Sequence, residues 1–263
     1  MHLHALETYR PASSPLHRLD PRVKTLLALA LILTAALIPD RRWGALAALQ
    51  VMLLWATVCS RVGLGLVQRR AVAALPFTLA ALTVIFATPG RALLTLPLPG
   101  GPWIVTDAGL VRFVAIVARA YVSIQGAVLL AATTPFPDLL QALRAFGLPR
   151  LLVAMTGFLY RYLFVLADEA QRMMQARRAR STRSLRPTTL RSLAWRARVT
   201  GSMAGVLFIR AYERGERIYL AMLARGYDGE TRALSTPALR RMDLLAGGCA
   251  GALLGAVLIL ARK

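Results

Sequence analysis

Acidic residues, cysteines and histidines are scarce in this chain. Its 263 residues include 12 aspartates and glutamates, two cysteines and three histidines, against 33 lysines and arginines. Cys59 and Cys249 both lie in apolar segments, which predicts buried free thiols and neither a disulfide framework nor a metal site. The sequence also lacks a G-x-x-x-x-G-K-[ST] loop and an H-E-x-x-H motif, which mark nucleotide and catalytic zinc sites. We therefore expect a protein that is not an enzyme and binds no cofactor of its own.

Long apolar runs fill most of the rest of the sequence. Apolar residues make up 57% of the chain and its mean hydropathy is +0.54, values typical of membrane proteins. A helix needs about 20 mostly apolar residues to cross roughly 30 Å of hydrocarbon. Five segments approach that length: Val23–Pro39, Trp43–Ser60, Ala71–Thr88, Leu110–Thr133 and Met242–Ala261. We predict an all-α integral membrane protein with about five transmembrane helices.

One stretch of 98 residues, Arg144–Arg241, holds 19 of the 33 basic residues. Because basic residues gather on the cytoplasmic side of membrane proteins, we place this stretch and the N-terminus inside the cell. Leu151–Ala167 and Val199–Ile209 are also apolar, but reading them as spans would put the nine arginines of Arg172–Arg198 outside. We predict instead that both segments form amphipathic helices at or under the inner surface.

The chain is thus expected to have three parts: an N-terminal four-helix transmembrane region at 1–133, a cytoplasmic arginine-rich module at 134–241, and a C-terminal transmembrane helix at 242–263. Within the first part, Pro89–Gly109 is rich in proline and glycine and predicts an external β-hairpin. Thr106 or Asp107 is expected to cap the helix that comes next. Arg119 lies midway through that helix, where it either has a function or pairs within the bundle.

Two long helices are predicted in the basic module, from about 150 to 180 and from about 188 to 226. Gly226 suits a left-handed C-cap at the end of the second helix. Each helix then ends in an exposed arginine, Arg180 or Arg225. Because a guanidinium group pairs bidentately with carboxylates, these tips predict docking into an acidic groove of a partner.

Gly201 and Gly205 lie four residues apart on the second of these helices. Such a pair of small residues lets another helix cross closely. We therefore expect a module of crossed amphipathic helices, with the crossing near these glycines.

Several short motifs are spread over nearly the whole chain. In chain order they are Leu19-Asp20-Pro21-Arg22-Val23-Lys24, Thr133-Thr134-Pro135-Phe136, Tyr160-Arg161-Tyr162, Glu169-Ala170, Arg172-Met173, Arg214-Gly215-Glu216-Arg217-Ile218-Tyr219, Ala221-Met222 and Ala224-Arg225-Gly226-Tyr227-Asp228-Gly229. Together they resemble the transmembrane T component of energy-coupling-factor (ECF) transporters, most closely the cobalt/nickel CbiQ type. The block from Glu213 to Gly229 is the most specific part of the resemblance.

The resemblance implies a coupling subunit of an ABC importer in the cell membrane of a bacterium or archaeon. In that family, two long coupling helices each end in an Ala-Arg-Gly motif that binds one of two ABC-type ATPase subunits, which hydrolyse the ATP. A separate substrate-binding membrane subunit is also held. Ala224-Arg225-Gly226 matches the motif fully, whereas Ala179-Arg180-Ser181 has a serine in place of the glycine.

Other interpretations remain open at this point. A basic membrane tether that binds anionic lipid or nucleic acid would show binding that falls steeply with salt, although the interleaving of basic residues with spans argues against a nucleic-acid partner. His2 and His4 are a weak candidate for metal binding. The sequence leaves the substrate, cobalt or nickel, undecided, because in the resembled family that choice belongs to another chain.

Overall fold

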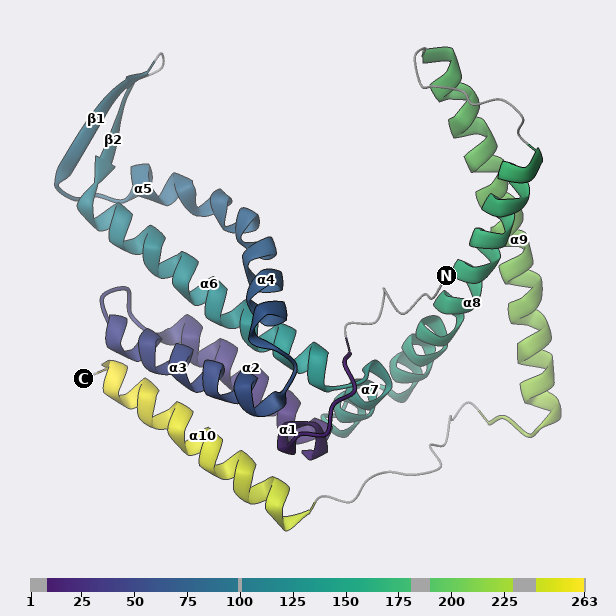
Figure 1. Cartoon of the computed structure of the whole chain (residues 1–263), viewed down its shortest axis with the longest axis horizontal. Coiled ribbons are helices and arrows are strands. Elements are labelled where there is room, and N and C mark those ends of the chain that lie inside the picture. The colour runs from purple at the N-terminus through teal and green to yellow at the C-terminus, as the bar shows by residue number, and fades with distance from the viewer. Residues whose placement is uncertain (1–8, 99–100, 181–189, 229–239, 263) are drawn as a thin grey trace. The chain divides into compact units, whose positions relative to one another are not determined.

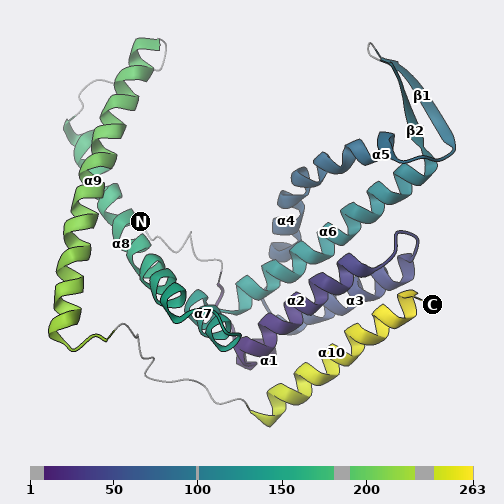
Figure 2. The same ribbon diagram turned by 180° about the vertical axis from the view of Figure 1, so that it is seen from behind.

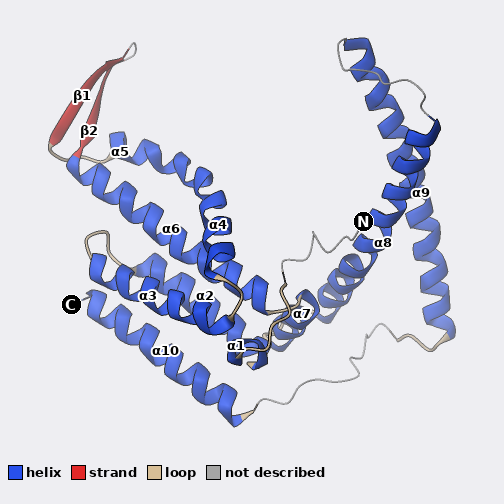
Figure 3. Cartoon of the chain, viewed as in Figure 1, coloured by secondary structure: helices blue, strands red, loops and turns tan. Residues whose placement is uncertain are grey.

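The computed structural model describes residues 9–98, 101–180, 190–228 and 240–262. Its contacts divide the chain into two units, one made of the described residues up to Ala145 together with 240–262, and the other of those from Phe146 to 228. Helices dominate both units (Figures 1 and 3). The all-α membrane fold predicted from the sequence is confirmed, with one small β-hairpin added to it.

The first unit, here called the bundle, contains all the elements outside the two long helices of the second unit. In chain order they are α1 (Pro15–Arg18), α2 (Pro21–Leu37), α3 (Trp43–Ser60), α4 (Leu64–Ala74), the 3₁₀ helix η2 (Leu75–Leu82), α5 (Thr83–Ala87), β1 (Ala92–Leu98), β2 (Gly101–Thr106), α6 (Asp107–Thr133), α7 (Phe136–Ala145) and α10 (Arg241–Arg262).

The core of the bundle lies where α2, α3, α6 and α10 pack together. Its buried apolar side chains are Leu31, Ala35, Ile38, Leu46, Leu49, Leu53, Val122, Leu254 and Ala261. Two glycines allow the close approach: a Cβ on Gly126 of α6 would lie 2.9 Å from Leu31, and one on Gly247 of α10 would lie 2.7 Å from Val23. Small residues at helix interfaces are how membrane helices pack closely.

A buried lysine ties several segments together at one end of the bundle. Lys24 of α2 is only 7% exposed, and its Nζ donates to the backbone oxygens of His17 and Thr133, at 3.2 Å each. These bonds hold the N-terminal segment and the end of α6 against the start of α2. The next helix, α7, lies at the start of the predicted cytoplasmic module, yet it packs on α2 within the bundle because its Leu140 and Ala142 are buried there.

The third predicted span, Ala71–Thr88, does not form one α-helix as expected. The segment starts earlier, at Leu64, and its backbone changes from α-helix to 3₁₀ helix at Leu75 and back to α-helix at Thr83. Pro76 accounts for the break, because proline lacks an N–H donor and its ring clashes with the preceding turn of an α-helix.

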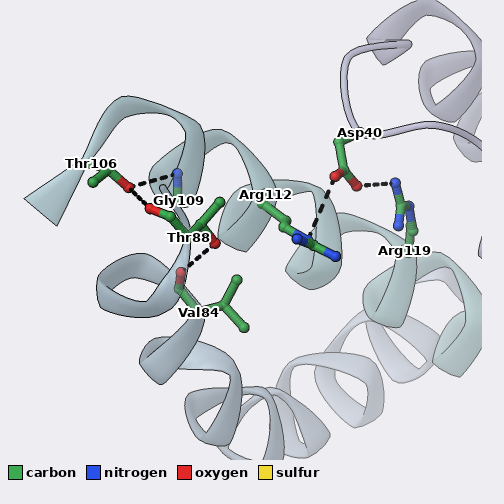
Figure 4. A network of polar contacts seen from close by, with 7 residues as sticks. All are labelled: Asp40, Val84, Thr88, Thr106, Gly109, Arg112 and Arg119. Carbon is green, nitrogen blue, oxygen red and sulfur yellow. Dashed lines mark hydrogen bonds and ion pairs between the residues drawn. The ribbon is translucent and has the colours of Figure 1, made fainter. Parts of the chain in front are cut away.

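The hairpin and the cap of α6 agree with the prediction. Strands β1 and β2 pair antiparallel, with Leu98 opposite Gly101 at the turn. Thr106 is the N-cap of α6, and its Oγ1 accepts a hydrogen bond from the Gly109 backbone N at 3.1 Å. The same oxygen donates to the carbonyl of Thr88 at 2.8 Å, so one hydroxyl fixes the end of α5 against the start of α6 (Figure 4).

Of the described residues, four helices are long and apolar enough to cross a membrane by length and composition: α3, α6, α10 and α8 (Arg150–Arg180) of the second unit. The α2 helix is slightly shorter, at 17 residues. Because α8 satisfies the same criteria as the bundle helices, the expectation that its apolar half lies at the inner surface stays a prediction.

The second unit consists of α8 and α9 (Leu190–Ala224), two long helices that run in opposite directions and cross each other (Figures 1 and 2). The described α8, Arg150–Arg180, agrees with its predicted bounds, and α9 ends at Ala224, two residues before its predicted limit, while its predicted start near Thr188 lies outside the described residues. Most side chains of both helices are exposed or half-buried.

Candidate functional site

The end of α9 places Arg225 at an exposed tip. Gly226 has φ +78, and the backbone N atoms of Gly226 and Tyr227 donate to Leu223 O at 2.9 Å and Met222 O at 3.0 Å. This confirms the left-handed C-cap expected from Gly226, a conformation that costs a residue with a Cβ about 1–2 kcal/mol. The helix therefore stops directly after Ala224, and the exposed Arg225 begins the turn.

The end of α8 also carries an arginine, as predicted. Arg180 is the last residue of α8, and both it and Ala179 are exposed. Ser181, the position at which the second motif departs from Ala-Arg-Gly, lies outside the described residues. The two predicted tips thus belong to one unit and stand at the C-terminal ends of its two helices.

A groove of about 570 Å³ runs between α8 and α9. From α8 it is lined by Glu169, Arg172, Met173, Ala176, Arg177 and Arg180, and from α9 by Trp195, Val199, Met203 and Arg210. The spacings of three, four and multiples of these place each set on a single face of its helix. We call this surface the α8–α9 groove.

Three contacts between the helices flank this groove. Arg210 of α9 forms an ion pair with Glu169 of α8. Arg177 of α8 donates from Nη1 to Thr200 Oγ1 at 3.5 Å, and its guanidinium carbon lies 5.8 Å from the ring centroid of Trp195. In the sequence Arg210 is one of several arginines along its helix, and no local signal identifies Glu169 as its partner.

Gly201 and Gly205, the predicted crossing point, face open space. A Cβ built on either glycine would meet no described atom within 4 Å. Phe208 and Tyr212, which continue the same face of α9, are 72% and 68% exposed. Helices α8 and α9 meet beside these glycines, at Thr200 and Arg210, but neither glycine lies at that contact, and close packing through Gly201 and Gly205 stays a prediction. We call Gly201, Gly205, Phe208 and Tyr212 the exposed α9 face.

Arg119 is a candidate for either a functional role or pairing, and the structure shows pairing. Its Nη2 donates to Asp40 Oδ1 at 2.5 Å, and Arg112 Nε lies 3.8 Å from Asp40 Oδ2 (Figure 4). Asp40 lies between α2 and α3 and was not singled out from the sequence, where the available signal was that it is the one acidic residue between Asp20 and Asp107.

A second polar group inside the bundle was also missed. Gln125 of α6 is fully buried; it accepts a hydrogen bond from Gln50 Nε2 at 3.0 Å and donates to Gln68 Oε1 at 2.8 Å. Tyr121 donates its hydroxyl to the same oxygen of Gln68. The glutamines come from α3, α4 and α6, so they link three helices.

Among the described residues, no group of three or more histidines, cysteines, aspartates and glutamates is placed to hold a metal ion. His2 and His4, the weak metal candidate of the sequence, lie outside the described residues.

Comparison with known proteins supplies the context for this geometry. The chain is 34% identical to the cobalt transport protein CbiQ of Rhodobacter capsulatus over 60% of its own length and 62% of that protein. It is 29% identical to the energy-coupling factor transporter transmembrane protein EcfT of Heliobacterium modesticaldum, over 85% and 84% of the two chains. It is also 34% identical to the nickel permease LarQ of Lactiplantibacillus plantarum, over 37% and 33%.

The chain therefore spans less than two thirds of the length of the first and third of these relatives. The CbiQ family, described as cobalt transport protein, matches residues 12–235, which include most of the bundle and both long helices with their arginine tips. This chain belongs to the CbiQ family of cobalt transport proteins, as its motifs suggested.

Proposed function

We propose that this chain is the coupling (T) subunit of an ECF-type ABC importer in the cell membrane, and that α8 and α9 transmit ATP-driven motion from two ATPase subunits to a substrate-binding membrane subunit. The observation that carries the proposal is the exposed Arg225 at the left-handed end of α9, matched by Arg180 at the end of α8. Membership of the family and the likeness to EcfT support it.

Docking of the ATPases is assigned to the two helix ends, Ala179-Arg180-Ser181 and Ala224-Arg225-Gly226. An arginine at the end of a rigid helix can enter a groove of a partner and pair bidentately with a carboxylate there. Two such tips on one unit suit two copies of an ATPase, each of which receives one arginine.

Transmission is assigned to the contacts between the two helices. The Glu169–Arg210 ion pair and the Arg177–Thr200 hydrogen bond join α8 to α9, so a displacement of one tip is passed to the other helix. The exposed α9 face supplies an apolar surface with room for a close helix at Gly201 and Gly205, and we assign it to the substrate-binding subunit.

The remaining assignments follow from this role. The chain is non-catalytic and holds no cofactor, and its ATPase partners hydrolyse the ATP. Residues 1–133 and 242–263 anchor it in the bilayer, and 134–241 form the coupling module. Cobalt is the proposed substrate and nickel the alternative, and the choice between them rests with the substrate-binding subunit.

Co-purification tests the proposal directly. The tagged chain is expressed with its genomic neighbours and extracted in detergent, as the native sequence and as Arg180→Glu/Arg225→Glu. We expect ABC ATPase subunits to remain with the native chain and to be reduced on the order of tenfold or more in the double variant, the effect of losing a central arginine from an interface.

The matched control is Arg198→Glu, which reverses one exposed charge on α9 away from both tips and the groove. It should retain the ATPases. Equal retention by the double variant would overturn ATPase docking through the arginine tips and leave a basic membrane tether as the better interpretation.

A further inference from the structure

The α8–α9 groove combines strong positive charge with apolar walls. Four arginines line it, and Glu169, the single acidic residue among its described lining residues, is already paired with Arg210. The guanidinium groups of Arg172 and Arg177 therefore face the groove without a carboxylate from the groove to neutralise them. Arg172 is exposed and Arg177 is half-buried, and guanidinium groups clustered in this way attract an anion with several acceptor oxygens.

The apolar side chains in the lining indicate that the anion also carries an apolar part. Trp195, Val199 and Met203 stand along α9, with Met173 and Ala176 opposite on α8. Trp195 is 46% exposed, and tryptophan is enriched where a membrane meets water. A soluble anion such as inorganic phosphate uses only the arginines and leaves these side chains in water.

We propose that the α8–α9 groove binds an anionic phospholipid of the inner leaflet, whose phosphate contacts Arg172 and Arg177 and whose glycerol and upper acyl chains lie against Trp195 and the neighbouring apolar side chains. Clusters of about four to eight basic residues on amphipathic helices at the cytoplasmic surface are a known kind of site for anionic lipid headgroups. The carboxylates of an acidic protein segment would pair with the arginines equally well, but such a segment would make fewer apolar contacts with the tryptophan and the methionines.

This site shares Arg180 with the proposed docking tips and Arg177 with the contacts assigned to transmission. Arg180 lines the groove and is also a proposed docking tip, so it is left unchanged in the test. The variant Arg172→Gln/Arg177→Gln removes the two charges assigned to the phosphate. The matched control Arg161→Gln/Arg198→Gln removes one arginine from each helix outside the groove lining.

The experiment measures tryptophan quenching in the complex as it co-purifies, reconstituted with phospholipids brominated on their acyl chains. Brominated phosphatidylglycerol, an anionic lipid, is compared with brominated phosphatidylcholine, which is zwitterionic. The chain has four tryptophans, so Trp195→Phe identifies the part of the signal that comes from the groove. We expect a phosphatidylglycerol-specific component that disappears in Trp195→Phe.

In Arg172→Gln/Arg177→Gln the affinity for phosphatidylglycerol should fall on the order of thirtyfold, from the usual contribution of two basic residues near an anionic membrane. The control should bind as the native chain does, and Arg172→Lys/Arg177→Lys should keep most of the binding because the charge remains. ATPase retention, followed in the same samples, shows that the variants are folded and separates this result from the docking proposal.

Three results would overturn the lipid assignment. Equal quenching by phosphatidylcholine would remove the need for an anion. Displacement of the phosphatidylglycerol signal by millimolar inorganic phosphate would show a soluble anion site. Absence of the Trp195 component in the assembled complex, where a protein subunit could cover the groove, would assign the arginines to that subunit.

Discussion

Arg119, in the middle of α6, donates a hydrogen bond to Asp40, which precedes it by 79 positions in the sequence; the distance from Nη2 to Oδ1 is 2.5 Å. The side chain of Arg119 is 19% exposed and that of Asp40 is 37% exposed. A charged residue at this depth of a membrane bundle is costly unless it is paired. The pair therefore joins the α2–α3 connection to α6.

Replacing Asp40 with asparagine should lower the stability of the bundle. The substitution leaves a largely buried guanidinium group without its counter-charge, and because Asp40 is partly exposed we expect a loss of about 1–2 kcal/mol. Thermal unfolding of the purified chain in detergent measures it. Arg41→Gln, at an exposed neighbouring position, is the control. An unchanged melting temperature for Asp40→Asn would show that the ion pair contributes nothing.

Gly109→Ala should destabilise the junction between α5 and α6. A Cβ at Gly109 would overlap with the carbonyl oxygen of Ile85, and backbone cannot move aside as a side-chain tip can. We expect a cost of about 1–3 kcal/mol, as for other overpacked positions, again seen in thermal unfolding. Gly44→Ala, whose Cβ would meet no described atom within 4 Å, should be neutral or slightly stabilising.

The buried glutamines give a third prediction. Gln125→Met keeps the volume of the side chain but removes both hydrogen bonds of Gln125. Gln50 then loses its acceptor and Gln68 loses a donor inside the bundle. Polar contacts between membrane helices average about 0.6 kcal/mol each, so the variant should lose about 1 kcal/mol in the same assay. A gain in stability would contradict the prediction that the hydrogen bonds of Gln125 stabilise the bundle.

Gly226→Ala should reduce ATPase retention although it leaves both arginines in place. Its φ of +78 costs an alanine about 1 kcal/mol, and relief of that strain turns Arg225 away from its position. Gly226→Asn, which tolerates the left-handed region better, should retain more ATPase than Gly226→Ala in quantitative co-purification. Equal ATPase retention by the native chain, Gly226→Ala and Gly226→Asn would show that the left-handed cap does not contribute to docking.

Gly201→Leu tests the assignment of the exposed α9 face. The chain itself has space for the leucine, so the variant should fold and keep its ATPases, while the substrate-binding subunit and metal uptake are lost together. Ser202→Leu, also exposed but about 100° further around the helix, is the matched control. Loss of both kinds of subunit from Gly201→Leu would contradict a separate surface for the substrate-binding subunit.

The features of this structure that the sequence predicts are those determined by residues close together in the chain. The bounds of α8 follow from local signals, the glycine and prolines on either side of it, and the C-cap at Gly226 follows from the glycine alone. The cap at Thr106 is likewise local. These features agree with the structure because neighbouring residues determine them.

The features that were not predicted depend on residues far apart in the chain. The partner of Arg119 is Asp40, and the partner of Glu169 is Arg210, so neither pair can be recognised before the helices are placed. The α8–α9 groove depends on which faces of the two helices meet where they cross, and the sequence describes each helix only by itself. The break in the third predicted span was missed because Pro76 is compatible with a kinked α-helix as well as with a 3₁₀ segment.

The 3₁₀ segment η2 sets the orientation of α5 and of the hairpin beyond it. A 3₁₀ helix turns 120° per residue and an α-helix 100°, so over the eight residues Leu75–Leu82 the two geometries differ by about 160°. The side of α5 that contacts α6 is therefore selected by the winding of the segment before it. Were Leu75–Leu82 to wind as an α-helix, α5 would present its opposite side to α6, and the hairpin would leave α5 in a different direction.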